Sequence, residues 1–278
     1  MTLDTNALLL LMTLLLLAGL VAGVLAGLLG VGGGIVVVPV TYQVLLLAGV
    51  PTEHLMHIAV GTSLALIIPG AWRSASGHHA RGAVLPWLLR RWWVALVAGV
   101  VFGVVLARVL SSTALALIFA AVVLLMGCYL LLAPERLRLG ERLPRGPAGA
   151  AIPGVIGTVS ALMGIGGGSL SVPAMTAYGI PVHQAVGTSA ALGLLIAMPG
   201  AVGFVLTGWG QGGLPPYSLG YVNIIALACL LPTMLLGVPL GVRLAHLASP
   251  RTLRLAFAAF LLLTGLRMAL AALGTAQS

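Results

Sequence analysis

The sequence predicts an all-α polytopic membrane protein made of two inverted-topology repeats of about five helical segments each. Three observations support this prediction. Charged residues make up 6% of the 278 residues, residues of the AVILMFWYC set make up 60%, and the second half of the chain repeats motifs of the first. Charged residues make up about 25% of an ordinary soluble domain. The composition therefore excludes a soluble globular protein.

The charged residues are arranged as in a membrane protein. All 13 basic residues are arginines, the acidic residues number 4, and the net charge is +9. The arginines lie in short gaps between apolar runs, where membrane-flanking charges are found, and not on a surface suited to nucleic acid. We expect the lipid bilayer as a partner and no nucleic acid. Cys128 and Cys229 lie within apolar runs, so we expect no disulfide, no metal and no cofactor.

Each half of the chain divides into five apolar segments. They cover 6–29, 34–48, 55–72, 92–110 and 113–133 in the first half, and 148–165, 169–180, 184–207, 219–246 and 252–273 in the second. A spanning helix needs about 20 apolar residues. The short segments 34–48 and 169–180 follow a glycine triplet and contain a proline, so we interpret them as half-helices or re-entrant pieces. The total is eight to ten transmembrane segments. The run 6–29 is too long for a signal peptide and lacks a basic start.

The internal repeat is clearest in a glycine motif. GVGGGIVVVP at 30–39 recurs as GIGGGSLSVP at 164–173. Further pairs follow in the same order: GVP at 49–51 with GIP at 179–181, AVGTS at 59–63 and at 185–189, PGA at 69–71 and at 199–201, and GxxxG at 99–103 and at 237–241. An ordered series of matches indicates two copies of one ancestral unit. We expect a first repeat at 1–133, a basic linker at 134–147 and a second repeat at 148–278.

The arginines predict that the two repeats have opposite orientations. The gap after the third segment holds four arginines in the first repeat and none in the second, and the next gap reverses this contrast. Because positive residues favour the cytoplasmic side, equivalent loops lie on opposite faces. We expect a multi-pass protein of the cell membrane, in a bacterial inner membrane, with linker 134–147 cytoplasmic and both termini periplasmic. Inverted repeats are a recurrent plan of secondary transporters, whose substrate site lies near the bilayer midplane.

The two glycine triplets are the main candidates for a substrate site. Successive glycines disfavour a helix by about 0.8–1 kcal/mol each, and unwound backbone inside a bilayer is tolerated only where it is buried in protein or lines a cavity. Such a break presents backbone N–H groups and the positive end of the next half-helix, which together bind anions. The alternative is close helix packing through small residues. The candidate residues are Gly32, Gly33, Gly34, Ile35, Gly166, Gly167, Gly168 and Ser169.

Hydroxyl groups recur in the third segment of each repeat. Thr62 and Ser63 correspond to Thr188 and Ser189. A hydroxyl donates a hydrogen bond to an anion without bringing a charge into the bilayer, so we include all four as candidate substrate-binding residues. The alternative is a hydrogen bond to a carbonyl one turn earlier in the same helix.

Three titratable residues are candidates for coupling or proton relay. His57 and His183 are equivalent positions, and a histidine there titrates near neutral pH or caps a helix at the membrane interface. Glu53 is the only acidic residue between position 4 and the linker, and its charge also suits a helix N-terminus. Arg267 is expected to extend toward the membrane surface from near the outer end of its helix. Weaker candidates for ligand contact are Gln43, Arg73 and Asn223.

These motifs resemble the sulfite exporter TauE/SafE family, also called the 4-toluene sulfonate uptake permeases. The resemblance covers about 10–272 and rests on GVGGGIVVVP and GIGGGSLSVP, the GVP and GIP turns, and the AVGTS segments. It implies a membrane transporter of sulfur-containing anions such as sulfite, sulfoacetate or aryl sulfonates. It also implies that the motifs at 30–34 and 164–168 line the central site. It leaves the substrate and the direction of transport open.

The leading hypothesis is a secondary transporter of small sulfur-containing or organic anions that works by alternating access. An anion channel on the same scaffold and a non-transporting membrane scaffold with GxxxG faces for partner helices are the alternatives. An enzyme is not expected, because the chain has no HExxH motif, no paired acids and no Cys/His pair. The expected partner is a small anionic substrate, and a homo-oligomer remains open.

Overall fold

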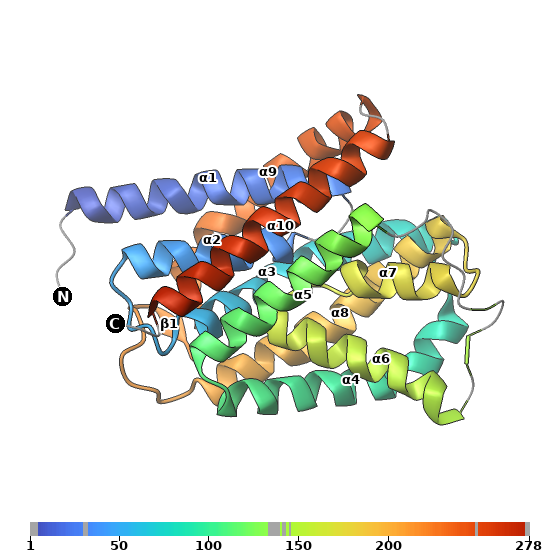
Figure 1. Ribbon diagram of the computed structural model, residues 1–278, viewed down its shortest axis with the longest axis horizontal. Helices are drawn as coiled ribbons and strands as arrows, with labels where there is room; N and C mark the ends of the chain where they lie inside the picture. Colours follow the sequence, from blue (N-terminus) through green and yellow to red (C-terminus); the bar gives the residue numbers. More distant parts are fainter. Residues whose placement is uncertain are drawn as a thin grey trace.

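The computed structural model describes residues 5–29, 33–132, 140, 143–144, 146–247 and 250–275. Within them the first half of the chain forms α1 (Thr5–Leu29), α2 (Gly34–Leu47), α3 (Leu55–Ala80), α4 (Pro86–Val109) and α5 (Ser112–Leu132). The second half forms α6 (Gly146–Met163), α7 (Gly168–Ala177), α8 (Val182–Thr207), α9 (Ile224–Leu247) and α10 (Pro250–Thr275). A short antiparallel hairpin of β1 (Ser218–Leu219) and β2 (Val222–Asn223) precedes α9. The predicted five segments per half are confirmed (Figure 1).

The helix lengths fit a multi-pass membrane protein. Among the described residues 7 helices are long and apolar enough to cross a membrane, namely α3, α4, α5, α6, α8, α9 and α10, and α1 has 25 residues. By contrast, α2 has 14 residues and α7 has 10. At 1.5 Å per residue they measure about 21 Å and about 15 Å, less than the bilayer core of about 30 Å. The prediction that these two segments are half-helices is confirmed.

Three helix boundaries differ from the prediction by five residues or more. Helix α9 begins at Ile224 and not at 219, because the strands of the hairpin occupy the residues before it. Helix α3 ends at Ala80, whereas the apolar run predicted an end at 72. The residues after 72 are more polar, but no proline follows Pro69 within them, so nothing ends the helix there. Helix α4 begins at Pro86 and not at 92, since a proline in the first turn suits a helix start. Helices α3 and α4 therefore project beyond the apolar runs that predicted them.

The helices of the two halves exchange partners. Helix α1 packs against α9, and their counterparts α6 and α4 pack against each other; α3 packs against α8, and α5 against α10. In Figure 1 the α1–α9 pair and the α4–α6 pair lie at opposite edges, with α3 and α8 between them. The N-terminal part of α3, from Leu55 to Leu64, is buried, whereas outer faces carry apolar side chains such as Leu125 and Leu263, exposed by 70% and 69%. Such exposed apolar faces fit contact with lipid.

Equivalent glycines make equivalent contacts in the two halves. A Cβ atom added to Gly99 in α4 would lie 2.1 Å from the Gly154 carbonyl oxygen in α6, and one added to Gly237 in α9 would lie 2.4 Å from the Leu20 carbonyl oxygen in α1. Gly237 is the counterpart of Gly99 in the repeat, and Gly154 is the counterpart of Leu20. The GxxxG motifs therefore bring helix backbones together.

Each central helix runs antiparallel to its counterpart. Gly127 of α5 lies against Leu262 of α10, while its counterpart Gly265 of α10 lies against Leu124 of α5, the counterpart of Leu262. In the same way Gly61 of α3 lies against Phe204 of α8, and Gly200 of α8 lies against Leu64 of α3. Counterparts that cross antiparallel are related by a twofold axis perpendicular to the helices. The repeats are therefore inverted.

The ends of the halves lie as the inverted arrangement requires. The start of α1 and the end of α10 lie at one end of the bundle, and the end of α5 and the start of α6 lie at the opposite end (Figure 1). Most of the linker predicted at 134–147 lies outside the described residues. That the linker faces the cytoplasm stays a prediction.

Candidate functional site

Both glycine triplets interrupt the helices, as predicted. In the second half α6 ends at Met163, Gly164 adopts a φ of +65°, and α7 begins at Gly168. In the first half α1 ends at Leu29, Gly33 adopts a φ of +73°, and α2 begins at Gly34. A positive φ is readily adopted only by glycine, so Gly33 and Gly164 determine where the chain turns. Residues 30–32, which include the candidate Gly32, lie outside the described residues.

The two interruptions touch each other in the centre of the protein. A Cβ atom added to Gly34 would lie 2.6 Å from the Gly164 carbonyl oxygen and 2.9 Å from the Ile165 Cα atom. Gly34 also approaches Ile67, in the middle of α3, and Gly167 approaches Gly193, in the middle of α8. Because α3 and α8 are spanning helices, the breaks lie halfway across the protein. From there α2 and α7 run toward opposite ends of the bundle (Figure 1).

The first backbone amides of both half-helices are free of intrahelical hydrogen bonds. In α2 the earliest such bonds run from the N–H groups of Val36 and Val37 to the Gly33 carbonyl, and in α7 the earliest runs from Ser171 to Gly167. The preceding amides, which include those of Gly34, Ile35, Gly167 and Gly168, have no acceptor within their helix. They are also the positive ends of the helix dipoles. The centre of the protein therefore offers hydrogen-bond donors without a buried basic side chain.

The two candidate serines differ in their hydrogen bonds. The Ser63 hydroxyl donates to the Gly164 carbonyl at 2.6 Å and so lies at the second break. The Ser189 hydroxyl donates to the Val186 carbonyl of its own helix at 2.8 Å, which is the alternative considered for these residues. A substrate contact by either serine stays a prediction.

The two candidate threonines anchor loops. The Asn223 amide, just before α9, donates to the Thr62 hydroxyl oxygen at 3.0 Å, and the Leu85 amide, just before α4, donates to the Thr188 hydroxyl oxygen at 3.0 Å. The glycine ahead of each threonine, Gly61 or Gly187, makes room for the same loop. The repeated GTS sequence is thus a docking site for the chain that enters the fourth helix of the other repeat.

Sequence reasoning missed this role of the GTS motif. The signal that would have found it is the equivalence of Leu85 and Asn223, each of which lies directly before the fourth helix of its repeat. Substrate contact by Thr62 or Thr188 stays an untested prediction, and the structure gives both hydroxyl groups another partner.

The candidates for proton relay lie away from the breaks. His57 is buried near the start of α3, ten residues or about 15 Å along the helix from Ile67. Its Nε2 atom hydrogen-bonds the Ala107 carbonyl at 3.0 Å, and its ring lies 4.9 Å from that of Tyr221. Its Nδ1 atom has no partner among the described residues. His183, the counterpart of His57, is exposed.

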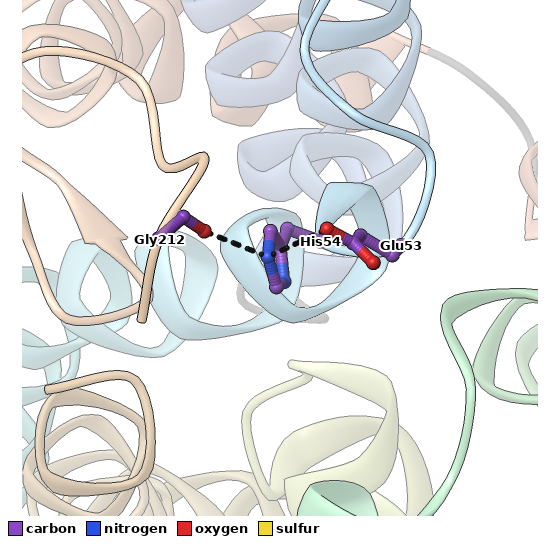
Figure 2. A network of polar contacts seen from close by, with 3 residues as sticks. All are labelled: Glu53, His54 and Gly212. Atoms are coloured by element: carbon purple, nitrogen blue, oxygen red, sulfur yellow. Dashed lines mark hydrogen bonds and ion pairs between the residues drawn. The ribbon is translucent and has the colours of Figure 1, made fainter. Parts of the chain in front are cut away.

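Glu53 belongs to a small polar network at the same end of α3. Figure 2 shows Glu53 beside His54, at 3.3 Å, and His54 within 3.1 Å of the Gly212 carbonyl oxygen. The Glu53 side chain is 72% exposed. Burial, and secondarily the charge of Glu53, raises the pKa of the nearby Tyr221 hydroxyl. This network connects α3 to the loop before α9, and its role in coupling stays untested.

Two cavities flank the half-helices. One of about 470 Å³ lies between α5 and α7 and reaches Gly168 and Ser169 at the start of α7. The other, of about 420 Å³, lies between α2, α10 and α1. They occupy equivalent places, since Pro173 lines the first and its counterpart Pro39 lines the second. The central contact of the breaks therefore has a cavity beside each half-helix.

The comparisons with known proteins agree with this architecture. A sequence model of the sulfite exporter TauE/SafE family matches residues 15–268. A probable membrane transporter protein of Haemophilus influenzae is 35% identical over 92% of this chain and 97% of its own length. A probable membrane transporter protein of Methanocaldococcus jannaschii is 28% identical, with coverages of 94% and 97%. No solved structure matches the chain. The chain is a membrane transporter and belongs to the sulfite exporter TauE/SafE family.

Proposed function

We propose that the protein is a secondary transporter that moves small sulfur-containing or organic oxyanions across the cell membrane by alternating access. The observation that carries the proposal is the meeting of two helix interruptions halfway across the protein, each followed by the start of a half-helix. Sulfite, sulfonates and sulfoacetate are the substrate class that the family resemblance favours.

The chemistry of the breaks favours an anion. Free amides and the positive ends of α2 and α7 attract negative charge, and oxygen atoms are the acceptors that amides bind best. Gly34 and Gly167 have no side chain, so once the two breaks separate a ligand can approach their backbone closely. We place the substrate contacts at Gly33, Gly34, Ile35, Gly166, Gly167, Gly168 and Ser169, with Ser63 beside them. His57, His183 and Glu53 lie at helix ends, and we leave them outside this site.

Alternating access explains the closed centre better than a channel does. Gly34 packs against Gly164 and Ile165 without space for another atom, so an anion passes only when the two breaks separate. An inverted repeat supplies two equivalent conformations, because the two halves exchange roles when one opens and the other closes. The cavities beside α2 and α7 are the paths that such a movement would open to opposite faces.

A stability screen tests the proposal. The purified protein is heated with sulfite, sulfoacetate, taurine, thiosulfate or small carboxylates, and its melting temperature is recorded. A ligand at 100 times its Kd stabilises the folded state by about 2.7 kcal/mol, which corresponds to a rise of roughly 5–10 °C for a chain of this size. No rise with any anion contradicts a small-anion site. Electrical recording separates a transporter from a channel, since sustained conductance through single openings would show a pore.

Orientation needs its own measurement. We propose that linker 134–147 faces the cytoplasm and that both termini face the periplasm, since the linker contains four arginines. A reporter that is active only in the cytoplasm should work when inserted in the linker and fail at the C-terminus. The reverse pattern would contradict the proposed orientation.

A further inference from the structure

The cavity beside α2 has a charged side chain in its wall, whereas the described residues that line its counterpart include none. Gln43 of α2 and Thr264 and Arg267 of α10 line it together with apolar residues. The counterpart positions in the other half are Ala177, Met126 and Tyr129, none of which is charged. The duplication of the fold therefore does not explain this polar group.

Arg267 lies nearer the bilayer midplane than its place in the sequence indicates, and its side chain is exposed at the surface of the bundle. The contacts of Gly127 with Leu262 and of Gly265 with Leu124 place the crossing of α5 and α10 midway between them, at residues 125–126 of α5 and 263–264 of α10, where the twofold axis passes. Arg267 is three to four residues beyond this crossing, or about 5 Å along the helix. The hydrocarbon core extends about 15 Å from the midplane. The backbone of Arg267 is therefore about a third of the way from the midplane to the edge of the hydrocarbon, and not near the outer end of its helix.

Within the described part of the chain no acidic side chain pairs with Arg267, and no hydrogen bond is made by its guanidinium. A charge at this depth is costly unless a counter-charge accompanies it, and such residues generally serve a ligand. Arginine binds oxyanions through two parallel hydrogen bonds, and it stays charged at all physiological pH values. The Gln43 amide and the Thr264 hydroxyl add neutral donors to the same wall.

We propose that the cavity between α1, α2 and α10 is a second oxyanion site, in which Arg267 binds a sulfate-, sulfonate- or phosphate-type group with help from Gln43 and Thr264. The site exists in one half only and is separate from the central breaks, so it stands independently of the proposed transport function. The oxyanion is either a dissolved ion or the phosphate of an anionic lipid whose headgroup reaches the cavity. The chemistry of recognition is the same for both.

Equilibrium binding of radiolabelled sulfate to the purified full chain tests the site. Arg267→Gln should weaken binding at least tenfold, which is the loss of one charged hydrogen bond, and Thr264→Val should weaken it less. Arg243→Gln, at an exposed position of α9, is the matched control and should leave the affinity unchanged. Melting temperatures recorded without sulfate show whether each variant is folded.

Repeating the titration in the Gly167→Pro background separates this site from the central one. The proposal is supported if the Gly167→Pro variant still binds sulfate and this binding is weakened by Arg267→Gln. That result does not depend on whether the central site binds an anion. Unchanged affinity in Arg267→Gln, or loss of all sulfate binding in Gly167→Pro alone, would overturn it. In phosphatidylcholine nanodiscs, competition by phosphatidylglycerol identifies a lipid phosphate as the natural occupant. Undiminished sulfate binding identifies a dissolved ion.

Discussion

The threonine anchors make a sharp prediction about stability. Thr62 and Thr188 are both fully buried, at 0% exposure, and each accepts a 3.0 Å hydrogen bond from a loop amide. Replacing either by valine keeps the shape of the side chain and leaves a buried N–H group without an acceptor. The expected cost is about 1–3 kcal/mol, or a fall in melting temperature of roughly 2–12 °C. Because the two anchors are equivalent, Thr62→Val and Thr188→Val should have similar effects.

Tryptophan fluorescence of the detergent-solubilised protein during heating measures the effect. Thr207→Val is the matched control, because the Thr207 hydroxyl donates only to the Gly203 carbonyl of its own helix, at 2.9 Å. Its change should stay within about 0.5 kcal/mol. Gly61→Ala brings a Cβ atom to 2.6 Å from the Tyr221 carbonyl oxygen of the loop that Thr62 anchors. Its effect should therefore couple with Thr62→Val and add independently to Thr188→Val.

Either of two results would be inconsistent with a loop-anchoring role of Thr62 and Thr188. Thr62→Val and Thr188→Val could both be as stable as the wild type, which would show that the two loop amides find other acceptors. Alternatively, Thr207→Val could destabilise the protein as much as Thr62→Val and Thr188→Val do. This result would show that losing any threonine hydroxyl from a helix lowers the stability, whether or not a loop docks on it.

Two further predictions test the packing of the repeats. Gly99→Ala and Gly237→Ala should each destabilise the protein by about 1–3 kcal/mol, because the added methyl meets a carbonyl oxygen of the neighbouring helix. Gly77→Ala is the control: a Cβ atom there has nothing within 4 Å, so this substitution should be neutral or stabilising by up to about 1 kcal/mol. Thermal unfolding compares the three variants. Cysteines replacing Gly127 and Leu262, which lie against each other, should cross-link within one chain, as read from gel mobility under oxidation. Failure of that pair together with cross-linking of cysteines that replace the counterparts Ala120 and Ala258, which antiparallel helices hold about 16 Å apart, would contradict the antiparallel crossing.

The sequence allowed the helix interruptions and the inverted arrangement to be predicted, because both have local causes. Gly33 and Gly164 adopt positive φ angles that glycine favours, and prolines follow each break. The inverted arrangement was inferred from the uneven distribution of arginines between equivalent loops and from the ordered series of repeated motifs, and neither depends on how the helices pack. The short lengths of α2 and α7 followed from the short apolar runs.

Features that depend on packing between distant segments could not be predicted in this way. The loop-anchoring role of Thr62 depends on Asn223, 161 residues away. Ser63 and Ser189 have the same sequence context but different acceptors, the carbonyl of Gly164 at the second break and the carbonyl of Val186 in the same helix. The depth of Arg267 is fixed by where α5 and α10 cross, and hydropathy does not reveal that point.

The central claim is that backbone amides of the glycine breaks bind the anion, and Gly167 allows the most direct test. Its φ of −58° suits proline, and among the described residues no acceptor is bonded to its amide. Gly167→Pro therefore removes the N–H group, while Gly167→Ala adds a Cβ atom, 3.1 Å from the Ile196 Cδ1 atom, and keeps the N–H group.

Affinity for the anion that most stabilises the wild type is then measured by calorimetric titration of both variants. We expect Gly167→Ala to bind the anion with an affinity within about threefold of the wild type, and Gly167→Pro to lose about 10–150-fold in affinity, the range of one hydrogen bond to a charged group. Equal affinities in wild type, Gly167→Ala and Gly167→Pro, with melting temperatures unchanged, would show that the Gly167 amide does not bind the anion.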